Sequence, residues 1–290
     1  MSYLFLTIVV VLITTQSIAK KQYNLKVKQS NSFLFSAIAA LFALIVFLIT
    51  AKFKLDLSLD LVPYSIGFAV SYASALVGTL LAIMWGPLSI TLLINSYSLI
   101  IPTLYGLIAL DEKFTAVKIL GLVLLALSLL LISTVLERKG NPQQRKFSLK
   151  WLMALILGFT GNGICSTVQK MQQISFFGQF KSEFMVIALV IVVITLTIAA
   201  IINREDLRID TMPCVTLAAI SGIANGIVNL LVMVLSAPGG MEASILFPSM
   251  SGGGIVLGLL LSIFVYKEKL SALQYLGYAM GTASVILLNI

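Results

Sequence analysis

The chain has 290 residues, of which 59% are hydrophobic and only 10% charged, and its mean hydropathy is +1.07. This composition excludes an ordinary soluble domain and is typical of a protein with many membrane-spanning segments. The formal net charge of +8 comes from Lys and Arg in short stretches between apolar segments, so membrane topology accounts for it and we expect no nucleic-acid partner.

Windows of about 20 apolar residues, the length of helix that crosses a hydrocarbon core of about 30 Å, predict ten membrane-spanning helices. They cover residues 2–20, 32–51, 62–84, 86–110, 114–134, 151–170, 182–202, 212–236, 241–265 and 270–290. Helix is expected because backbone groups in lipid must satisfy their own hydrogen bonds, and the windows lack the alternation of barrel strands. The predicted fold class is therefore all-α integral membrane.

The first span has a second interpretation as a signal peptide, with the small residues SIA before Lys20 as a cleavage site. No basic segment precedes this span, however. A shift of 150 residues also aligns Lys20 with Lys170 and Gln22 with Gln172. We therefore assign the first span to the mature fold.

The chain contains an internal repeat. Shifting residues 110–134 onto 266–290 matches Glu112 with Glu268, and the Lys that follows each of them is also shared. A Gly nine residues after each Glu matches as well, which makes chance similarity between Leu-rich segments a poor explanation.

The longest polar run of the chain separates the two copies. We predict a first five-helix repeat at 1–136, a basic linker loop at 137–150 and a second five-helix repeat at 151–290. Because five is an odd number, the second copy enters the membrane in the opposite sense, which makes two inverted repeats related by a pseudo-two-fold axis in the membrane plane.

The basic residues indicate the orientation in the membrane. Thirteen of the 19 Lys and Arg fall on one side of the predicted helices and six on the other. The positive-inside rule puts the thirteen in the cytoplasm and both termini outside.

The two repeat hinges read LIALDEKFTAVKILG around Glu112 and IFVYKEKLSALQYLG around Glu268. At these hinges the chain resembles the drug/metabolite transporter (DMT) superfamily, and within it the ten-helix EamA-type permeases. The segment GNGICSTVQK, which ends at Lys170, is similar to the Gly- and Asn-rich segment of that family. The resemblance covers the whole chain. It implies two five-helix inverted repeats and a transporter, in many members an exporter, but it does not specify a substrate.

Polar side chains recur at helical spacing on the first, fourth, sixth and eighth spans, which marks faces that turn away from lipid. Packing between helices accounts for such residues as well as a ligand does, but the inverted repeat would bring these four helices together near the midplane. Asn225 and Asn229 are the strongest candidates. The predicted substrate-binding residues are Gln16, Lys20, Asn95, Ser98, Asn162, Ser166, Lys170, Asn225, Asn229 and Ser251.

The ninth span contains Pro248 followed by three consecutive glycines at 252–254. The glycines have two interpretations. They allow close helix packing, for example through Gly254 and Gly258, or the helix breaks and offers backbone groups to a substrate.

The hinge glutamates lie at span ends, where a solvated pair with Lys or a charge at a helix N-terminus costs little, so we expect them to be structural. No carboxylate occupies the middle of a span, although a proton-coupled exporter of organic cations would need one. Lys20 and Lys170 instead suggest a substrate with a carboxylate or phosphate. The alternative is that both lysines snorkel to the membrane surface.

We therefore expect a secondary active transporter of a small polar metabolite, of the amino acid or organic anion type, that exports by alternating access around a central cavity. The alternatives are an organic-cation exporter of the same fold and a membrane receptor or accessory subunit without transport. We expect no enzyme, because there is no His and no Ser or Cys beside a base. The cysteines lack metal spacing, so we expect neither cofactor nor metal. The expected location is the cell membrane, as a multi-pass monomer, with a homodimer left open.

Overall fold

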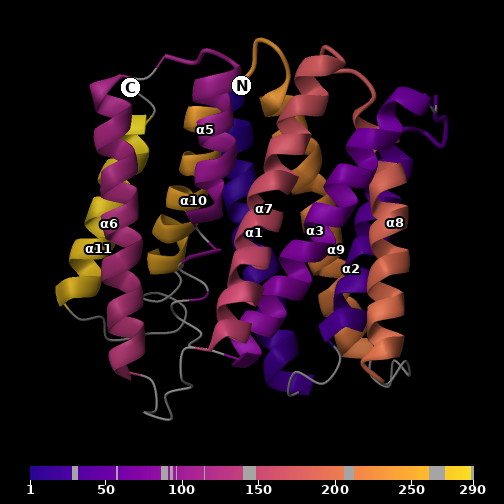
Figure 1. Ribbon diagram of the computed structural model, residues 1–290, viewed down its shortest axis with the longest axis horizontal. Helices are drawn as coiled ribbons and strands as arrows, with labels where there is room; N and C mark the ends of the chain where they lie inside the picture. Colours follow the sequence, from indigo (N-terminus) through magenta and orange to yellow (C-terminus); the bar gives the residue numbers. More distant parts are fainter. Residues whose placement is uncertain are drawn as a thin grey trace. The chain divides into compact units, whose positions relative to one another are not determined.

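The computed structural model describes residues 1–27, 32–56, 58–85, 91, 94–95, 97–113, 115–139, 148–205, 212–260 and 272–288 (Figure 1). Within these residues the chain forms ten α-helices, two short 3₁₀ helices and no β-strand. In chain order they are α1 Ser2–Val27, α2 Ser32–Thr50, η1 Leu59–Leu61, α3 Val62–Trp85, η2 Tyr97–Leu99, α5 Ile100–Ala109, α6 Ala116–Lys139, α7 Leu149–Ser175, α8 Lys181–Ile202, α9 Met212–Ser236, α10 Ala243–Leu260 and α11 Ala272–Leu288.

The helices follow the predicted spans closely, so the all-α class is confirmed over the described residues. α1 and α7 continue beyond their predicted ends, to Val27 and Ser175 respectively. The added turns are rich in Lys and Gln, which lower the hydropathy of a window but form helix readily. Residues 140–147 of the predicted linker, and the hinge at Glu268, lie outside the described residues.

The helix predicted over 86–110 is not one continuous α-helix. Among its described residues, 91, 94 and 95 are helical, the 3₁₀ turn Tyr97–Leu99 follows, and the regular helix α5 covers Ile100–Ala109. Ser98 Oγ donates a hydrogen bond to the carbonyl of Asn95 at 2.6 Å, and Pro102 has no N–H to donate back to Ser98. Both effects favour a fresh helix start near residue 100 over a continuous helix.

Five stretches of the described chain are long and apolar enough to cross a membrane. They are Ser32–Thr50, Leu59–Ala82, Leu149–Ser175, Lys181–Ile202 and Val215–Ser236. Between 28% and 44% of the residues in their apolar windows are buried inside the protein, so most of this apolar surface faces outward. Such surface is compatible with an integral membrane protein, because it requires an apolar surrounding.

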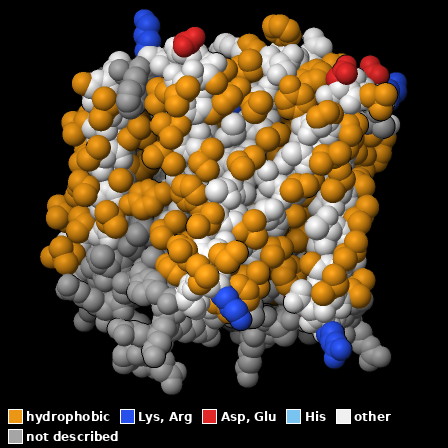
Figure 2. All heavy atoms as spheres, viewed as in Figure 1, with side chains coloured by type: hydrophobic (Ala, Val, Ile, Leu, Met, Phe, Trp, Pro, Cys, Tyr) orange, Lys and Arg blue, Asp and Glu red, His pale blue; other side chains and the backbone are white. Residues whose placement is uncertain are grey.

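The outer face of α8 illustrates this surface. Val190, Ile194, Ile198 and Ile202 recur every four residues and are 40–73% exposed. On the face shown in Figure 2, hydrophobic side chains extend along the helices, and the Lys, Arg, Asp and Glu side chains drawn in colour lie near helix ends. This exposed row of α8 is therefore apolar along its whole length.

The chain divides into two compact units. Unit 1 contains residues 1–73 and 168–240, and unit 2 contains residues 74–167 and 241–290. The boundaries fall inside α3 and α7, so each of these helices contributes one part to each unit. The units differ from the two predicted repeats, since each unit takes helices from both halves of the sequence. The repeats at 1–136 and 151–290 thus remain a prediction about the symmetry of the chain.

In unit 1, α9 packs against α1 and α2, and α2 also packs against α8. Glycines on α9 permit the approach to α2: a Cβ on Gly222 would lie 2.2 Å from the carbonyl oxygen of Ala39. The first part of α3 packs on α8, where the Phe68 and Phe184 rings meet edge to face with centroids 5.6 Å apart. Ser65 Oγ donates to the carbonyl of Phe184 beside them at 3.1 Å. The core of unit 1 is therefore built from small residues on one helix pair and aromatic rings on another.

In unit 2, α6 lies along α11 and α5 packs against α10 (Figure 1). Ser128 Oγ on α6 donates to the carbonyl of Gly277 on α11 at 2.6 Å, and both Ser128 and Ser284 are fully buried. Gly78 on α3 faces Gly158 on α7 so closely that a Cβ on Gly78 would lie 2.3 Å from the Gly158 nitrogen. Close packing of small residues thus joins the helices of this unit as well.

α10 continues as one helix through Pro248 and the three glycines, which supports packing over a helix break. Of the glycines at 252–254, Gly252 makes the close contact, whereas Gly254, which the spacing to Gly258 offered as an example, does not. A Cβ on Gly252 would lie 2.3 Å from Val285 Cγ2 on α11, whereas a Cβ on Gly254 would meet no atom within 4 Å. Spacing alone predicts that two glycines share a face, but it does not predict which face meets a neighbouring helix.

These two glycines form a matched pair for mutation. We expect Gly252→Ala to lower the free energy of unfolding by about 1–3 kcal/mol, because the new methyl group overpacks the contact with Val285. Gly254→Ala should be neutral or should stabilise by up to about 1 kcal/mol, because alanine is the better helix former and the space is open. Thermal unfolding of the purified variants in detergent measures both effects. Equal unfolding temperatures for the two variants would contradict this packing.

Candidate functional site

Four side-chain amides form a continuous hydrogen-bonded chain in unit 1. Asn225 Nδ2 on α9 donates to Gln16 Oε1 on α1 at 3.2 Å. One turn further along α9, Asn229 Nδ2 donates to Asn225 Oδ1 at 2.9 Å. Gln169 Nε2 on α7 then donates to Asn229 Oδ1, also at 2.9 Å. Three helices that are distant in sequence thus meet through amide groups, which we call the amide chain.

The amide chain lies within largely apolar helices. Gln16 is 9% exposed and Gln169 is 4% exposed, while Asn225 and Asn229 are half-buried. Burying an amide costs free energy unless its hydrogen bonds are made, and the bonds of the amide chain offset this cost. A leucine at the same positions would carry no such cost. Such an arrangement can bind a small polar molecule by exchanging some of these bonds for bonds to the ligand.

The amide chain contains three of the predicted residues, Gln16, Asn225 and Asn229. Sequence reasoning missed Gln169, because a four-residue step from Asn162 leads through Ser166 to Lys170. A step of seven residues from Asn162 reaches Gln169 and also stays on one helix face. Gln172 and Gln173, two further amides on α7, are fully buried as well and were also missed.

Lys170 follows Gln169 in the sequence and is also buried. It is 4% exposed, so its ammonium group stays inside the protein, whereas a snorkelling lysine would reach the surface. Lys20, its predicted partner from the repeat, lies on α1, but its side chain is outside the described residues.

Unit 2 has a second polar cluster around Asn95. Asn95 Nδ2 donates to Thr79 Oγ1 and Asn162 Nδ2 donates to Ser98 Oγ, each at 2.6 Å. The Oδ1 atom of Asn95 is buried and accepts no hydrogen bond, and a Cβ on Gly158 would lie 3.1 Å from it. The structure thus brings Asn95, Ser98 and Asn162 together in unit 2, whereas the three predicted residues of the amide chain belong to unit 1.

The two remaining predicted residues are less informative. Ser166 Oγ donates to the carbonyl of Asn162, four residues earlier in its own helix, at 3.2 Å. Ser251 is half-buried on α10, next to Gly252. The bond of Ser166 is a common local contact of serine in helices and does not indicate a ligand.

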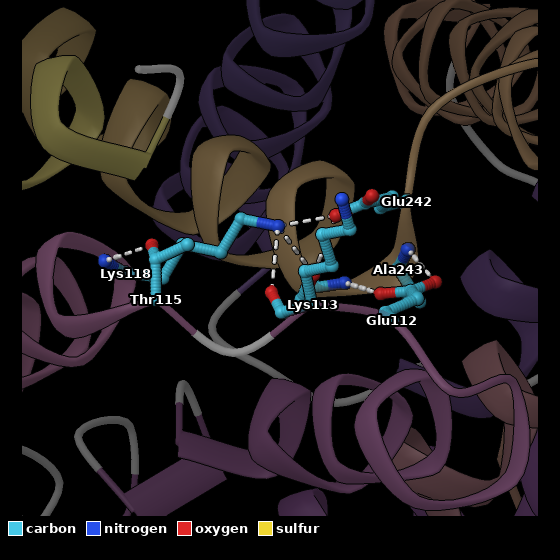
Figure 3. Close-up of polar contacts among 7 residues, drawn as sticks. Glu112, Lys113, Thr115, Lys118, Glu242 and Ala243 are labelled. Carbon is cyan, nitrogen blue, oxygen red and sulfur yellow. Dashed lines mark hydrogen bonds and ion pairs between the residues drawn. The ribbon is translucent and has the colours of Figure 1, made fainter.

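The Glu112 hinge caps a helix. Glu112 Oε1 accepts a hydrogen bond from the Ala243 N–H at 2.6 Å, and Oε2 accepts one from the Ser244 N–H at 2.8 Å (Figure 3). These N–H groups begin α10 and have no partner within the helix. A carboxylate at this end also interacts favourably with the helix dipole. The structure therefore supports a structural role for Glu112.

Lys118 lies beside this cap and is only 8% exposed. Its ammonium group forms an ion pair with Glu242 and donates to the carbonyl of Lys113 at 3.2 Å (Figure 3). Lys118 is thus held within unit 2 by the loop before α6 and by the residue before α10. The cluster explains charged residues near this helix end without a ligand.

Unit 1 has a carboxylate cap of the same kind. Glu205 follows α8 and accepts hydrogen bonds from the N–H groups of Phe33 and Leu34 at 2.9 and 2.7 Å. These residues begin α2. In each unit, therefore, a glutamate just after one helix caps the helix packed beside it.

Comparisons with known proteins indicate the fold but no family. No family model matches the chain, and no curated protein matches it. A solved structure described only as "Crystal structure of protein" is similar over 98% of this chain and 94% of its own, with a TM-score of 0.79 and 11% sequence identity. At this identity the likeness shows a shared fold alone. Fold and composition thus define an all-helical protein with several helices apolar enough to cross a membrane.

Proposed function

We propose that the protein is a secondary transporter of the cell membrane that exports a small polar metabolite of the amino acid or organic anion type by alternating access. The observation that carries this proposal is the amide chain of Gln16, Asn225, Asn229 and Gln169. It joins three apolar helices through groups that apolar packing alone would not require. Export rests on the resemblance to the EamA-type permeases.

The pattern of helix contacts supports the inverted repeat that this mechanism needs. The repeat makes spans two and seven, four and nine, and five and ten counterparts of each other. In the structure these pairs are α2 and α8, α5 and α10, and α6 and α11. All three pairs are in contact, and each joins a span to its repeat counterpart. A two-fold axis produces such contacts, because an element near the axis meets its own symmetry mate.

Contacts between other helices also occur in matching pairs. The contact of α1 with α9 joins spans one and eight, and the repeat converts it into a contact between spans six and three. That contact is present as the approach of Gly158 on α7 to Gly78 on α3. The contact of α2 with α9 corresponds in the same way to that of α8 with α3, where Phe184 meets Phe68.

The proposed substrate class rests on the residue types of the predicted site. Lys170, the residue after Gln169 on α7, is 4% exposed, the amide chain is neutral, and no Asp or Glu lies near the middle of a predicted span. Lysine and amide side chains suit a ligand that carries a carboxylate or phosphate, whereas an organic cation is bound best by a carboxylate.

Counterflow in proteoliposomes tests the function. Vesicles loaded with one compound at a time from a panel of amino acids, organic acids and organic cations should show saturable uptake of the labelled form for at least one amino acid or organic acid. Asn229→Ala should reduce this exchange by roughly tenfold or more, because a bound ligand would lose one hydrogen-bonding amide and the chain would be interrupted.

The control variant is Thr195→Val on α8, whose hydroxyl bonds only to the carbonyl of Ile191 in its own helix at 2.8 Å. It should exchange like the wild type. Exchange confined to organic cations would contradict the substrate class, and no exchange with any panel compound would contradict transport itself.

A further inference from the structure

The amide chain has a direction, which the backbone of α9 sets. Besides its bond to Asn225 Oδ1, Asn229 Nδ2 donates to the backbone carbonyl of Asn225 at 2.9 Å. A carbonyl oxygen can only accept a hydrogen bond. The nitrogen of the Asn229 amide must therefore face Asn225, and its oxygen must face Gln169.

This orientation determines the other three amides. Since Asn229 presents an oxygen to Gln169, Gln169 must donate through Nε2. Since Asn229 donates to Asn225 Oδ1, Asn225 has its own Nδ2 left to donate to Gln16 Oε1. The two ends of the chain consequently differ. Gln16 Nε2, with two N–H donors, takes no part in the chain at one end, and Gln169 Oε1, an acceptor, takes no part at the other.

We propose that the amide chain, in the direction that the Asn225 carbonyl sets, presents N–H donors at its Gln16 end for an acceptor oxygen of the substrate, and that Gln169 is a positioning residue that supports this direction by donating to Asn229 Oδ1. Carboxylate, carbonyl and phosphate oxygens fit this end, and an ammonium group does not. This inference rests on the proposed transport function for its ligand. The direction of the chain can be tested without any ligand.

The direction is tested by replacing the two ends with Glu and with Met. Glutamate has the shape of glutamine but accepts only, when ionised, while methionine makes no strong hydrogen bond. Glu at position 16 would keep the bond from Asn225, whereas Glu at position 169 would put oxygen against oxygen at Asn229. Each Glu variant is compared with the Met variant at the same position, which accounts for the loss of the native amide. Both positions are buried, so both Glu variants bear the cost of burying a charge, and this cost largely cancels when the two positions are compared.

For each position we take the unfolding temperature of the Glu variant minus that of the Met variant. We expect this difference to be larger at position 16 than at position 169. The opposite order, or equal differences, would overturn the proposed direction. All four variants change one buried side chain in the full-length protein. If one of them fails to purify, the half-life at fixed temperature in crude detergent extract gives the same ranking.

The positioning role is tested by counterflow with L-alanine, propionate and isopropylamine as probes. We expect exchange of the two carboxylates and none of the amine, with Gln169→Met raising KM roughly tenfold while the maximal rate is retained. An unchanged KM, or a loss confined to the maximal rate, would overturn the positioning role and leave transport standing. If the wild type exchanges isopropylamine alone, the donor end is contradicted. If it exchanges none of the probes or panel compounds, the proposed function fails while the unfolding temperatures still decide the direction.

Discussion

Replacing Gly78 by alanine should lower the free energy of unfolding by about 3 kcal/mol or more and should prevent much of the protein from folding. A Cβ at this position would lie 2.3 Å from the backbone nitrogen of Gly158 and 2.8 Å from the carbonyl oxygen of Ala154. Both atoms belong to the backbone of α7, so no side chain can rotate away. The two helix segments would have to separate, which would also disturb the bond between Asn95 and Thr79 next to them.

Gly67 provides the control on the same helix. A Cβ there would have Val168 Cγ2 as its nearest neighbour at 3.7 Å, which is an ordinary contact distance. Gly67→Ala should therefore be neutral or mildly stabilising, because alanine forms helix more readily than glycine. Fluorescence-detected size exclusion and thermal unfolding in detergent measure both variants. Similar yields and unfolding temperatures for the two would show that α3 and α7 do not approach as described.

Glu112→Gln should destabilise the start of α10 by about 2 kcal/mol, because two backbone N–H groups lose a charged acceptor. Glutamine keeps one oxygen, but its NH₂ group would face an N–H donor. A shift of the side chain is limited on one side, since Gly106 already lies so close that a Cβ there would be 2.6 Å from Glu112 Oε2. We expect faster hydrogen–deuterium exchange in the first turn of α10, together with a lower unfolding temperature.

The neighbouring variant Asp111→Asn is the matched control. Asp111 is exposed and has a φ of 51°, a conformation that asparagine also tolerates. It should leave exchange in α10 unchanged. If Glu112→Gln changed transport of a panel compound but left the exchange of α10 unaltered, the glutamate would have a role other than capping.

Sequence patterns predicted the helices well, because the hydropathy of a 20-residue window depends on whether the segment has an apolar surrounding. It does not depend on which helices pack against that segment. The ends of α2, α8 and α9 agree with the predicted spans within one residue. The failure at 86–110 has a local cause, since the Ser98 hydroxyl and Pro102 both favour a new helix start. A window average does not register such single residues.

The sequence predicted which polar residues share a helix face, but it did not predict which residues on other helices they bond to. Asn225 and Asn229 do share a face, as their four-residue spacing requires. That Gln169 bonds to Asn229 depends on how α7 rotates and slides against α9, and no spacing within either helix contains that information. For the same reason the spacing could not decide which of the glycines at 252–254 would meet a neighbouring helix.

The sequence by itself determined that this protein is helical, that its helices are apolar enough for a membrane, and which of their faces carry amides. These properties depend on residue type and on the 3.6-residue period, which are local. Only the tertiary structure decided that Glu112 caps α10, that Gly78 meets Gly158, and that four amides on three helices form one chain. Such contacts form between residues up to 209 positions apart, so they depend on the packing of whole helices against one another.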